Sequence, residues 1–335
     1  MAVARRLLPP RIEEVPVRIA IMGVGNCGTK TINSLAGAGV EIAKLIAVDT
    51  DINSLRNVRA HENIQIGENT VRGRGTGAEI SKGKASAEED ADKVVRAVGE
   101  TDLLIAIAGL GGGTGSGALP FLLASLREAY PEMAVISVVT LPFRYEGGHR
   151  LKNAQAGLRE IVVYSDCTIV NLNDILLEKY GEMPITEAYR RMDALIMKTV
   201  KSMVDMMDPR DAVHRVDFPD LVSIVRRSGV GFVGHGSHRS IRRALEAAIN
   251  SRLLDADPST ATGALIYMSI PSTITLTDMV EGPRLLTEKF GIEKIAMGAR
   301  VKELLRIPEV MVIATGVESR SVTDLIGDVR ELLKE

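Results

Sequence analysis

The chain has 335 residues, of which 45% are apolar, so it can bury a large core and its length suits two domains. Its formal net charge is −2, and this balance does not point to a nucleic-acid or membrane-surface partner. Only two cysteines, Cys27 and Cys167, are present, and no apolar run suits a signal peptide or a membrane span, so we expect a cytoplasmic protein without direct membrane insertion.

Short β-branched runs alternate with amphipathic segments through the first half of the chain. Buried parallel strands are predicted at 17–22, 44–49, 102–109, 133–139 and 167–172. Helical patterns lie between them at 88–99 and 119–130. This alternation predicts a doubly wound, mostly parallel α/β sheet, which binds its ligands beyond the carboxyl ends of the strands.

One long central helix is predicted over 184–207, where apolar residues recur at helical spacing after Pro184. The simplest interpretation of its Met and Leu stripe is core packing. Beyond it, strands are predicted at 229–234, 264–270, 294–300 and 309–317, with helices around 238–253 and 278–290. We therefore expect an N-terminal extension (1–14), a first domain (15–183), the central helix, and a smaller α+β domain (208–335).

The first glycine loop, GVGNCG (23–28), directly follows the first predicted strand. It fits the pattern G-x-G-x-x-G, and Asp49 ends the next strand about 20 residues later, as in dinucleotide-binding folds. Alone, the loop indicates only that backbone N–H groups at a helix start can approach phosphates. A tight strand-to-helix turn without a ligand is the alternative.

A second glycine loop, GLGGGTGSG (109–117), follows the strand at 102–109. Glycine permits positive φ and leaves the main chain open to a ligand, so successive N–H groups can form an anion nest, with hydroxyls from Thr114 and Ser116. The alternative is a flexible linker, but the loop joins a buried strand directly to an amphipathic helix, where a flexible linker is not expected. The loop therefore predicts a second phosphate contact, which NAD-binding folds do not need.

Other motifs follow in chain order: AVDTD (47–51), GRGTGAE (73–79), LPFRYEGGHR (141–150), LND (172–174), VDFPDL (216–221) and VIATGV (312–317). Together with the two glycine loops, they resemble the tubulin/FtsZ family, and VDFPDL resembles the loop that completes a neighbouring subunit's active site (the synergy loop). The chain looks most similar to prokaryotic, archaeal-like FtsZ, as a divergent member.

The resemblance implies one GTP or GDP molecule surrounded by these loops. Backbone amides would hold its phosphates, the third loop would close over the γ-phosphate, and a Glu–Arg pair would reach the ribose and phosphates. The implied residues are Gly25, Asn26, Cys27, Lys30, Asp49, Gly75, Gly77, Gly111, Gly112, Gly113, Thr114, Gly115, Glu146 and Arg150. Outside the motif LPFRYEGGHR, the preferred interpretation of Glu146 and Arg150 would be an ordinary surface salt bridge.

Guanine recognition is assigned by the resemblance to Asn173, Tyr189 and Asp193. Tyr189 matches the aromatic residue that stacks on the base, and Asp193 lies one helical turn later on the same face. A carboxylate there can accept from guanine N1–H and N2–H₂ together. The alternative for Asp193 is an ordinary solvated helix residue.

Catalysis would depend on Asp217 and Asp220, which in the family position the attacking water at a neighbour's γ-phosphate. The alternative is that either residue only caps the following helix. Arg215 replaces a family Asn and would either brace the neighbour's phosphates or displace the water. His235 and His238 are interpreted as loop residues at the surface, and no metal site is predicted.

The implied function is a GTPase that assembles head-to-tail into protofilaments in prokaryotic cell division, with Mg²⁺ held mostly by phosphate oxygens and water. Its partners would be copies of itself and division-site adaptor proteins, with no nucleic acid. A GTP-binding scaffold with little hydrolysis is one alternative. An NAD-dependent oxidoreductase is another, but it explains only the first loop and Asp49.

Overall fold

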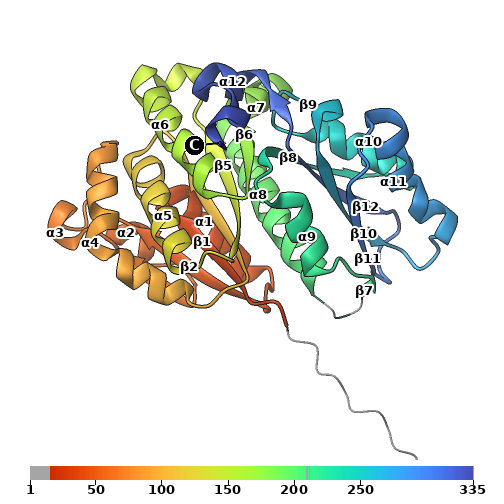
Figure 1. Ribbon diagram of the computed structural model, residues 1–335, viewed down its shortest axis with the longest axis horizontal. Helices are drawn as coiled ribbons and strands as arrows, with labels where there is room; N and C mark the ends of the chain where they lie inside the picture. The colour runs from red at the N-terminus through yellow and green to blue at the C-terminus, as the bar shows by residue number, and fades with distance from the viewer. Residues whose placement is uncertain (1–15, 209, 211, 335) are drawn as a thin grey trace, which may run out of the picture.

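The computed structural model describes residues 16–208, 210 and 212–334, and most of its strands join into one 11-stranded sheet (Figure 1). In spatial order the strands are β3 (Glu62–Gln65), β2 (Ala43–Asp49), β1 (Ile19–Val24), β4 (Leu103–Gly109), β5 (Ala134–Leu141), β6 (Cys167–Leu172), β8 (Gly229–Ser237), β12 (Glu309–Thr315), β10 (Gly263–Ile270), β11 (Ile295–Val301) and β7 (Ala212–His214). A separate pair joins β9 (Ala256–Asp257) to β13 (Glu318–Ser319).

The half of the sheet from β3 to β6 is parallel throughout, as predicted. All five strands predicted there are confirmed. β1, β4, β5 and β6 are apolar runs buried on both faces, and such runs are what the sequence pattern detects. The sequence analysis missed β3. This edge strand is short, polar and only partly buried, so it lacks the apolar run that predicts the others.

The other half of the sheet is mixed. β8 pairs in parallel with β6, from Cys167 opposite Gly229 to Ile169 opposite Gly231, while β12 is antiparallel to both β8 and β10. The predicted strands at 229–234, 264–270, 294–300 and 309–317 are confirmed. The smaller α+β part therefore continues the sheet of the first part.

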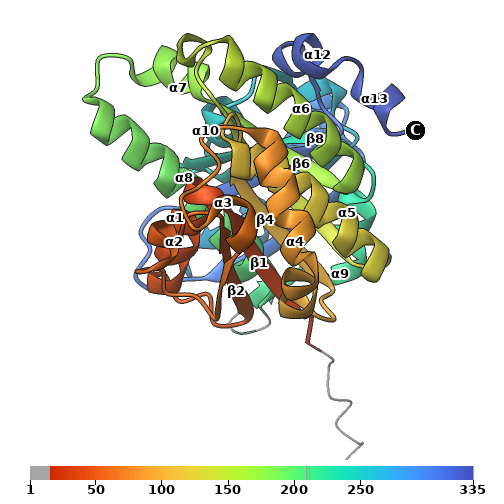
Figure 2. The same ribbon diagram turned by 90° about the vertical axis from the view of Figure 1, so that its left-hand side faces the viewer.

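The helices cover both faces of this sheet (Figure 2). One face carries α4 (Ile80–Val98), α5 (Leu119–Ala129), α6 (Gly148–Tyr164), α10 (Ile241–Ser251), α11 (Leu276–Phe290) and α12 (Arg320–Ile326). The other carries α1 (Gly25–Gly37), α7 (Asn173–Tyr180), α8 (Ile185–Met207) and α9 (Phe218–Val225). Shorter elements are α2 (Ile52–Leu55), α3 (Glu68–Val71), α13 (Val329–Leu332), the π-helical turn η1 (Thr114–Ala118), and the 3₁₀ turns η2 (Arg144–Glu146) and η3 (Pro258–Thr260).

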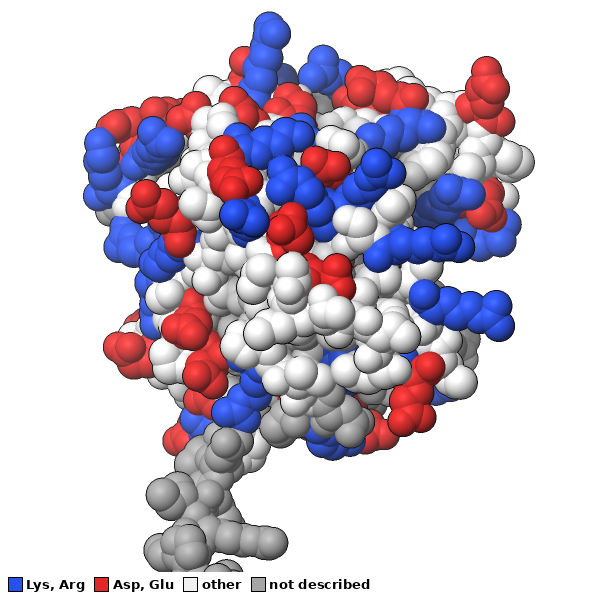
Figure 3. Space-filling model, turned by 90° about the vertical axis from the view of Figure 1, so that its right-hand side faces the viewer, with Lys and Arg blue, Asp and Glu red and all other residues white. Residues whose placement is uncertain are grey.

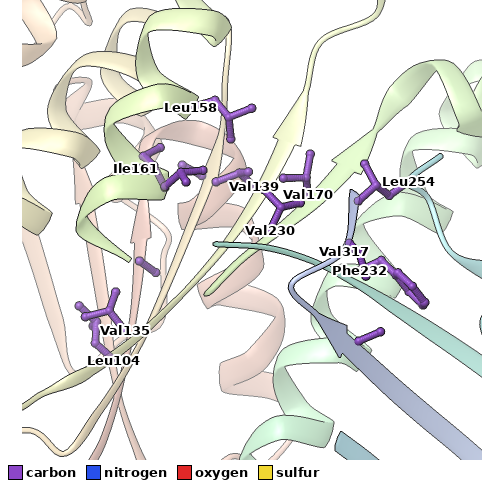
Figure 4. Packing of buried hydrophobic residues seen from close by; sticks show 14 of the residues in the cluster. Leu104, Val135, Val139, Leu158, Ile161, Val170, Val230, Phe232, Leu254 and Val317 are labelled. Carbon is purple, nitrogen blue, oxygen red and sulfur yellow. The ribbon is translucent and has the colours of Figure 1, made fainter. Parts of the chain in front are cut away.

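The predicted central helix is confirmed as α8, and its Met and Leu stripe is core. Met192, Ile196, Met203 and Met207 are buried against the sheet. On the opposite face, a single apolar cluster runs from β4 to β8 and on beneath β12, so both halves share one core (Figure 4). The long sheet and this shared core hold the carboxyl ends of the first-half strands in place.

Charges of both signs are interspersed over the face shown in Figure 3, and uncharged residues occupy much of its lower half. On α10 and α11, Arg242 lies 3.6 Å from Glu281, and Arg284 lies 2.9 Å from Glu288. Exposed pairs of this kind stabilise a fold by only about 1 kcal/mol or less each. Within the described residues, none of the helices combines the length and apolar character needed to cross a membrane.

Candidate functional site

A cleft of about 870 Å³ opens at the carboxyl ends of the parallel strands, with the first turns of α8 along one side. Seven separate segments of the chain meet there, most of them loops that follow the parallel strands. Most of the predicted nucleotide-binding residues line it: Gly25, Asn26, Cys27, Lys30, Asp49, Gly75, Gly112, Gly113, Thr114, Gly115, Glu146, Arg150, Asn173, Tyr189 and Asp193.

The two glycine loops form the floor of the cleft. Several of their glycines lie where a side chain would clash with neighbouring atoms or strain the backbone. Gly25 begins α1 with φ +74, in the left-handed region that favours glycine. A Cβ on Gly115 would lie 2.2 Å from the carbonyl oxygen of Gly109. A Cβ on Gly113 would lie 2.3 Å from the Thr76 hydroxyl oxygen, so the 73–79 loop rests directly on the second glycine loop.

Asp49 and Thr50 connect the end of β2 to this floor. Asp49 Oδ1 accepts hydrogen bonds from the backbone N–H groups of Thr50 (2.7 Å) and Asp51 (3.1 Å). The hydroxyl groups of Thr50 and Thr114 are hydrogen-bonded at 2.8 Å. Burial raises the pKa of the Asp49 carboxyl above its usual range, while the two backbone donors act in the opposite direction. Asp49 therefore holds the backbone of Thr50 and Asp51 in place at the edge of the cleft, and it also lines the cleft.

Several buried polar atoms in the cleft have no hydrogen-bond partner among the described residues. They are Asp49 Oδ2, Thr140 Oγ1 and Asn173 Oδ1. Buried polar groups in folded proteins are nearly always satisfied by protein, water or ligand. Three such atoms around one cleft, above a floor of backbone amides, fit a polar ligand that carries both hydrogen-bonding groups and negative charge.

The predicted Glu–Arg pair lies at the cleft wall. Glu146 Oε2 lies 3.2 Å from Arg150 Nη1, and Glu146 Oε1 accepts from the Phe143 backbone N–H at 2.9 Å. The Phe143 ring contacts Tyr189 edge-on, with ring centroids 6.1 Å apart, and stacks on Tyr145 at 4.8 Å. These contacts orient the pair and the Tyr189 ring toward the same cleft.

Asp193 lies near Lys30 and Cys27 on the facing helix. Partial burial raises the pKa of Asp193 above its usual range, and the positive charge of Lys30 opposes the shift. Burial, followed by the charge of Asp193, raises the pKa of the Cys27 thiol to about 11. Asp193 and Tyr189 both line the cleft, so the expectation that they share a face of the central helix is met.

Two of the glycines predicted at the nucleotide, Gly77 of the third loop and Gly111 of the second glycine loop, are not part of the cleft lining. Gly77 lies in the exposed part of its loop and Gly111 lies in a turn at φ +98. The N–H of Gly111 donates to Ser116 Oγ at 2.8 Å. The Gly111 N–H is therefore not free for a ligand as expected, and the Ser116 oxygen already accepts one hydrogen bond.

Further residues that the sequence analysis did not name as ligands also line the cleft: Thr50, Asp51, Ser54, Thr76, Ala78, Gly109, Leu110, Thr140, Pro142, Thr186, Arg190 and Met192. Seven of them lie inside the quoted motifs, for example Thr50 in AVDTD and Thr76 in GRGTGAE. Arg190 lies outside them but directly follows Tyr189. Thr140, near the end of β5, was detectable only as a polar residue at a strand end.

The predicted catalytic carboxylates lie outside this cleft, at the start of α9. Asp217 is the residue before the helix and makes no side-chain cap bond, and Asp220 lies in the first turn. Both are exposed, and Arg215 Nη2 lies 3.5 Å from Asp217 Oδ1. None of the three lines the cleft of its own chain.

The prediction for His235 is wrong. It lies within strand β8 rather than in a loop, and its ring Nε2 is hydrogen-bonded to the Thr199 hydroxyl of α8 at 3.0 Å. Burial, followed by the charge of Lys198, lowers its pKa to about 3. Within the described ranges, no group of three or more His, Cys, Asp or Glu side chains is arranged to hold a metal ion.

Comparison with known proteins decides the family. Residues 18–181 match the model of the tubulin/FtsZ family GTPase domain, and residues 229–318 match the FtsZ family C-terminal domain. Cell division protein FtsZ 1 of Pyrococcus woesei is 38% identical over 317 residues, which cover 93% of this chain and 86% of the relative. The chain belongs to the tubulin/FtsZ family.

Solved structures agree with this assignment. An empty FtsZ dimer from M. jannaschii superposes on this family member with a TM-score of 0.84 at 32% identity, covering 91% of this chain and 89% of the other. CetZ2 from Haloferax volcanii shares the fold, with a TM-score of 0.80 at 23% identity over 95% of this chain and 99% of that chain. The tubulin/FtsZ protein described here is thus a guanine-nucleotide-binding GTPase, and the dehydrogenase alternative is wrong.

Proposed function

We propose that this protein hydrolyses GTP between stacked copies of itself, and that the resulting protofilaments act in cell division. The observation that carries the proposal is the separation of two sets of residues. The cleft and its glycine floor lie at the carboxyl ends of the parallel strands, whereas Asp217 and Asp220 are exposed outside it. Head-to-tail stacking would bring one copy's carboxylates to the next copy's cleft.

In this arrangement the backbone amides of Gly25, Asn26, Cys27, Gly112, Gly113 and Gly115 would hold the phosphates, with Thr114 beside them. Glu146 would accept from the ribose hydroxyls, and Arg150 would donate to ribose or phosphate. Asn173, Tyr189 and Asp193 would select guanine. The unpartnered atoms of Asp49 and Asn173 support a ligand with hydrogen-bond donors at these places.

Phosphoryl transfer depends mainly on positioning and on charge stabilisation. Asp217 and Asp220 would orient the attacking water, and Asp217 makes no side-chain cap hydrogen bond to the helix that follows it. Mg²⁺ would neutralise triphosphate charge, held mostly by phosphate oxygens and water. In this scheme residues 15–183 bind nucleotide, 184–207 form the connecting helix, and 208–335 activate the neighbour.

The division role is supported by the relatives, which are named cell division proteins, and self-association is supported by the solved FtsZ dimer. The protein would act in the cytoplasm at the division site, where adaptor proteins would hold it. The ion pair of Arg215 with Asp217 favours one alternative, a GTP-binding scaffold with little hydrolysis, because it reduces the freedom of a catalytic carboxylate.

The test is GTP hydrolysis per subunit over a range of protein concentrations, with light scattering to follow assembly. We expect the rate to rise steeply above a critical concentration and to fall by at least about 100-fold in Asp217→Ala, with GTP binding unchanged. Arg215→Asn serves as the matched variant: a higher rate would show that Arg215 restrains turnover. A parent rate that stays near zero at all concentrations, with GTP bound, would reject shared-site hydrolysis and favour the scaffold.

A further inference from the structure

The buried side chain of Asn153 on α6 joins two loops that lie far from it in sequence. Its Nδ2 donates to the carbonyl oxygen of Ala78 at 2.7 Å and to that of Gly111 at 3.1 Å. Asn153 is only 3% exposed. A side-chain amide has two N–H donors, so both are used, one for each loop. The contact therefore connects the 73–79 loop to the second glycine loop through one residue.

The loop that Asn153 holds has an unfavourable backbone conformation. Gly73, Gly75 and Gly77 all have positive φ, which glycine adopts without cost, but Ala78 has φ +64. An alanine in the left-handed region is disfavoured and persists only when its surroundings impose it. The Ala78 carbonyl receives a second contact, since His149 Nε2 lies 3.2 Å from it. Asn153 and His149 thus form a clamp on Ala78.

The clamped loop also touches the floor of the cleft. Gly75, Thr76 and Ala78 line the cleft, and the loop packs so closely on Gly113 that a Cβ there would lie 2.5 Å from the Glu79 carbonyl oxygen. A movement of Ala78 would therefore change the cleft beside the second glycine loop. Behind the clamp lies a cavity of about 410 Å³, lined by His149, Asn153, Ser116 and Glu160 among others, which gives the clamp room to open.

We propose that Asn153, assisted by His149, is a positioning residue that holds the 73–79 loop in its closed form and thereby sets the preference for nucleoside triphosphate over diphosphate. This rests on the proposed function, in which the terminal phosphate faces that loop. Closing the loop around a γ-phosphate aligns its backbone donors with the additional charge. A diphosphate makes no contact there, so loss of the clamp affects its binding little.

The experiment measures the affinities of the full chain for GTPγS and for GDP, with Asn153→Leu beside the parent. Leucine has a similar volume but no donor. We expect GTPγS affinity to fall about tenfold and GDP affinity to change less than about twofold, as the loss of one buried hydrogen-bonding group allows. The matched control is Gln155→Leu, which removes an amide-to-carbonyl bond from the same helix to Leu325 and should leave the ratio of the two affinities unchanged.

His149→Ala provides the second variant, because His149 is exposed and its loss does not open the core. We expect a smaller drop in the same ratio, with His149→Gln restoring it by supplying a donor. Hydrogen exchange at the amides of residues 73–79, measured without nucleotide, should be faster in Asn153→Leu than in the parent.

If both variants keep the parent ratio, or lose both affinities equally, the clamp is refuted while the GTPase proposal stands. A parent that binds GTPγS and GDP equally well also refutes the clamp. A parent that binds neither nucleotide overturns both the clamp and the proposed function.

Discussion

At the scale of single residues, neighbouring glycines of the second loop differ in what surrounds them. Gly113 has the Thr76 hydroxyl and the Glu79 carbonyl at distances that a Cβ could not tolerate, whereas nothing lies within 4 Å of a Cβ built on Gly112. Of the two, only Gly113 is therefore held to glycine by close packing, although both line the cleft. The requirement comes from a loop more than 30 residues earlier in the chain, so it is invisible in the local sequence.

Gly113→Ala should lower the free energy of unfolding by about 1–3 kcal/mol, because backbone atoms must move to admit the methyl group. Gly112→Ala, the control, should change it by no more than about 0.5 kcal/mol. Urea unfolding without nucleotide measures both. Equal midpoints for the two variants would show that the 73–79 loop does not rest on Gly113 in solution.

At the scale of elements, the long helix α8 is joined to strand β8 by a polar contact inside an apolar interface. His235 of β8 is hydrogen-bonded through its ring to Thr199 of α8, and its backbone N–H donates to Ser251 Oγ at the end of α10. Lys198 of α8 and Glu309 of β12 form an ion pair nearby, 3.1 Å apart. Burial and the charge of Lys198 both disfavour a positive charge on the His235 ring, and this favours the neutral imidazole in the folded protein.

This contact makes stability depend on pH. The pKa of His235 is lowered to about 3 in the folded protein, so the unfolded chain binds more protons between that value and the ordinary pKa of about 6.5. The contribution of the neutral His235 ring to the free energy of unfolding is complete above pH 6.5 and is lost as the pH falls toward 3. Between pH 7 and pH 5, the parent should lose about 1 kcal/mol or more of unfolding free energy relative to His235→Gln.

Urea unfolding at pH 7, 6 and 5 checks this, and His238→Gln is the control from the same stretch of chain. Parallel pH dependence of the parent and His235→Gln would contradict a buried neutral imidazole. The difference between the two proteins is the informative quantity, because the other titratable groups are the same in both. Asp49 is one of them: its pKa is raised in the folded protein, so its contribution to the pH dependence has the opposite sign.

At the scale of the whole molecule, one sheet joins the cleft-bearing half to the half that carries the synergy loop. The β6–β8 pairing and the shared core beneath it make the two halves one packed unit. Asp217 and Asp220 therefore have a defined place relative to their own cleft, and that place is outside it. Under the proposed function, a second copy would supply the carboxylates for the cleft.

Two inactive variants should complement each other if the site is shared. Asp217→Asn keeps its cleft and Asp193→Ala keeps its carboxylates, so each alone should hydrolyse GTP slowly. In a 1:1 mixed filament, about one quarter of the interfaces would pair an intact cleft with intact carboxylates, because each subunit in a head-to-tail contact contributes a different surface. We expect the mixture to recover up to about that fraction of the parent rate.

Co-sedimentation establishes that both variants enter the same filaments. With mixed filaments present, activity no higher than the sum of the separate variants would mean that each chain uses its own carboxylates. The concentration series and the mixing experiment are independent, because the first varies the number of interfaces and the second varies their composition.

The features that depend on short-range pattern could be predicted from the amino-acid sequence. Strands β1, β2, β4, β5 and β6 were predictable because strands buried on both faces need uninterrupted apolar runs, and α8 was predictable from its helical periodicity. The glycine loops were predictable because phosphate contact requires exposed backbone amides after a strand. Most residues drawn from these motifs do line the cleft.

Two features could not be predicted and depend on the three-dimensional fold: which polar groups already have a hydrogen-bond partner, and which distant segments are in contact. The Gly111 N–H was expected to face a ligand but binds Ser116, and Asn153 reaches loops that lie 42 and 75 residues away. His235 was expected at the surface and is packed against α8, while the merger of both halves into one sheet depends on three residue pairs between β6 and β8. The physical reason is that local pattern fixes periodicity and burial, whereas hydrogen-bond partners between distant segments are set by where the chain returns.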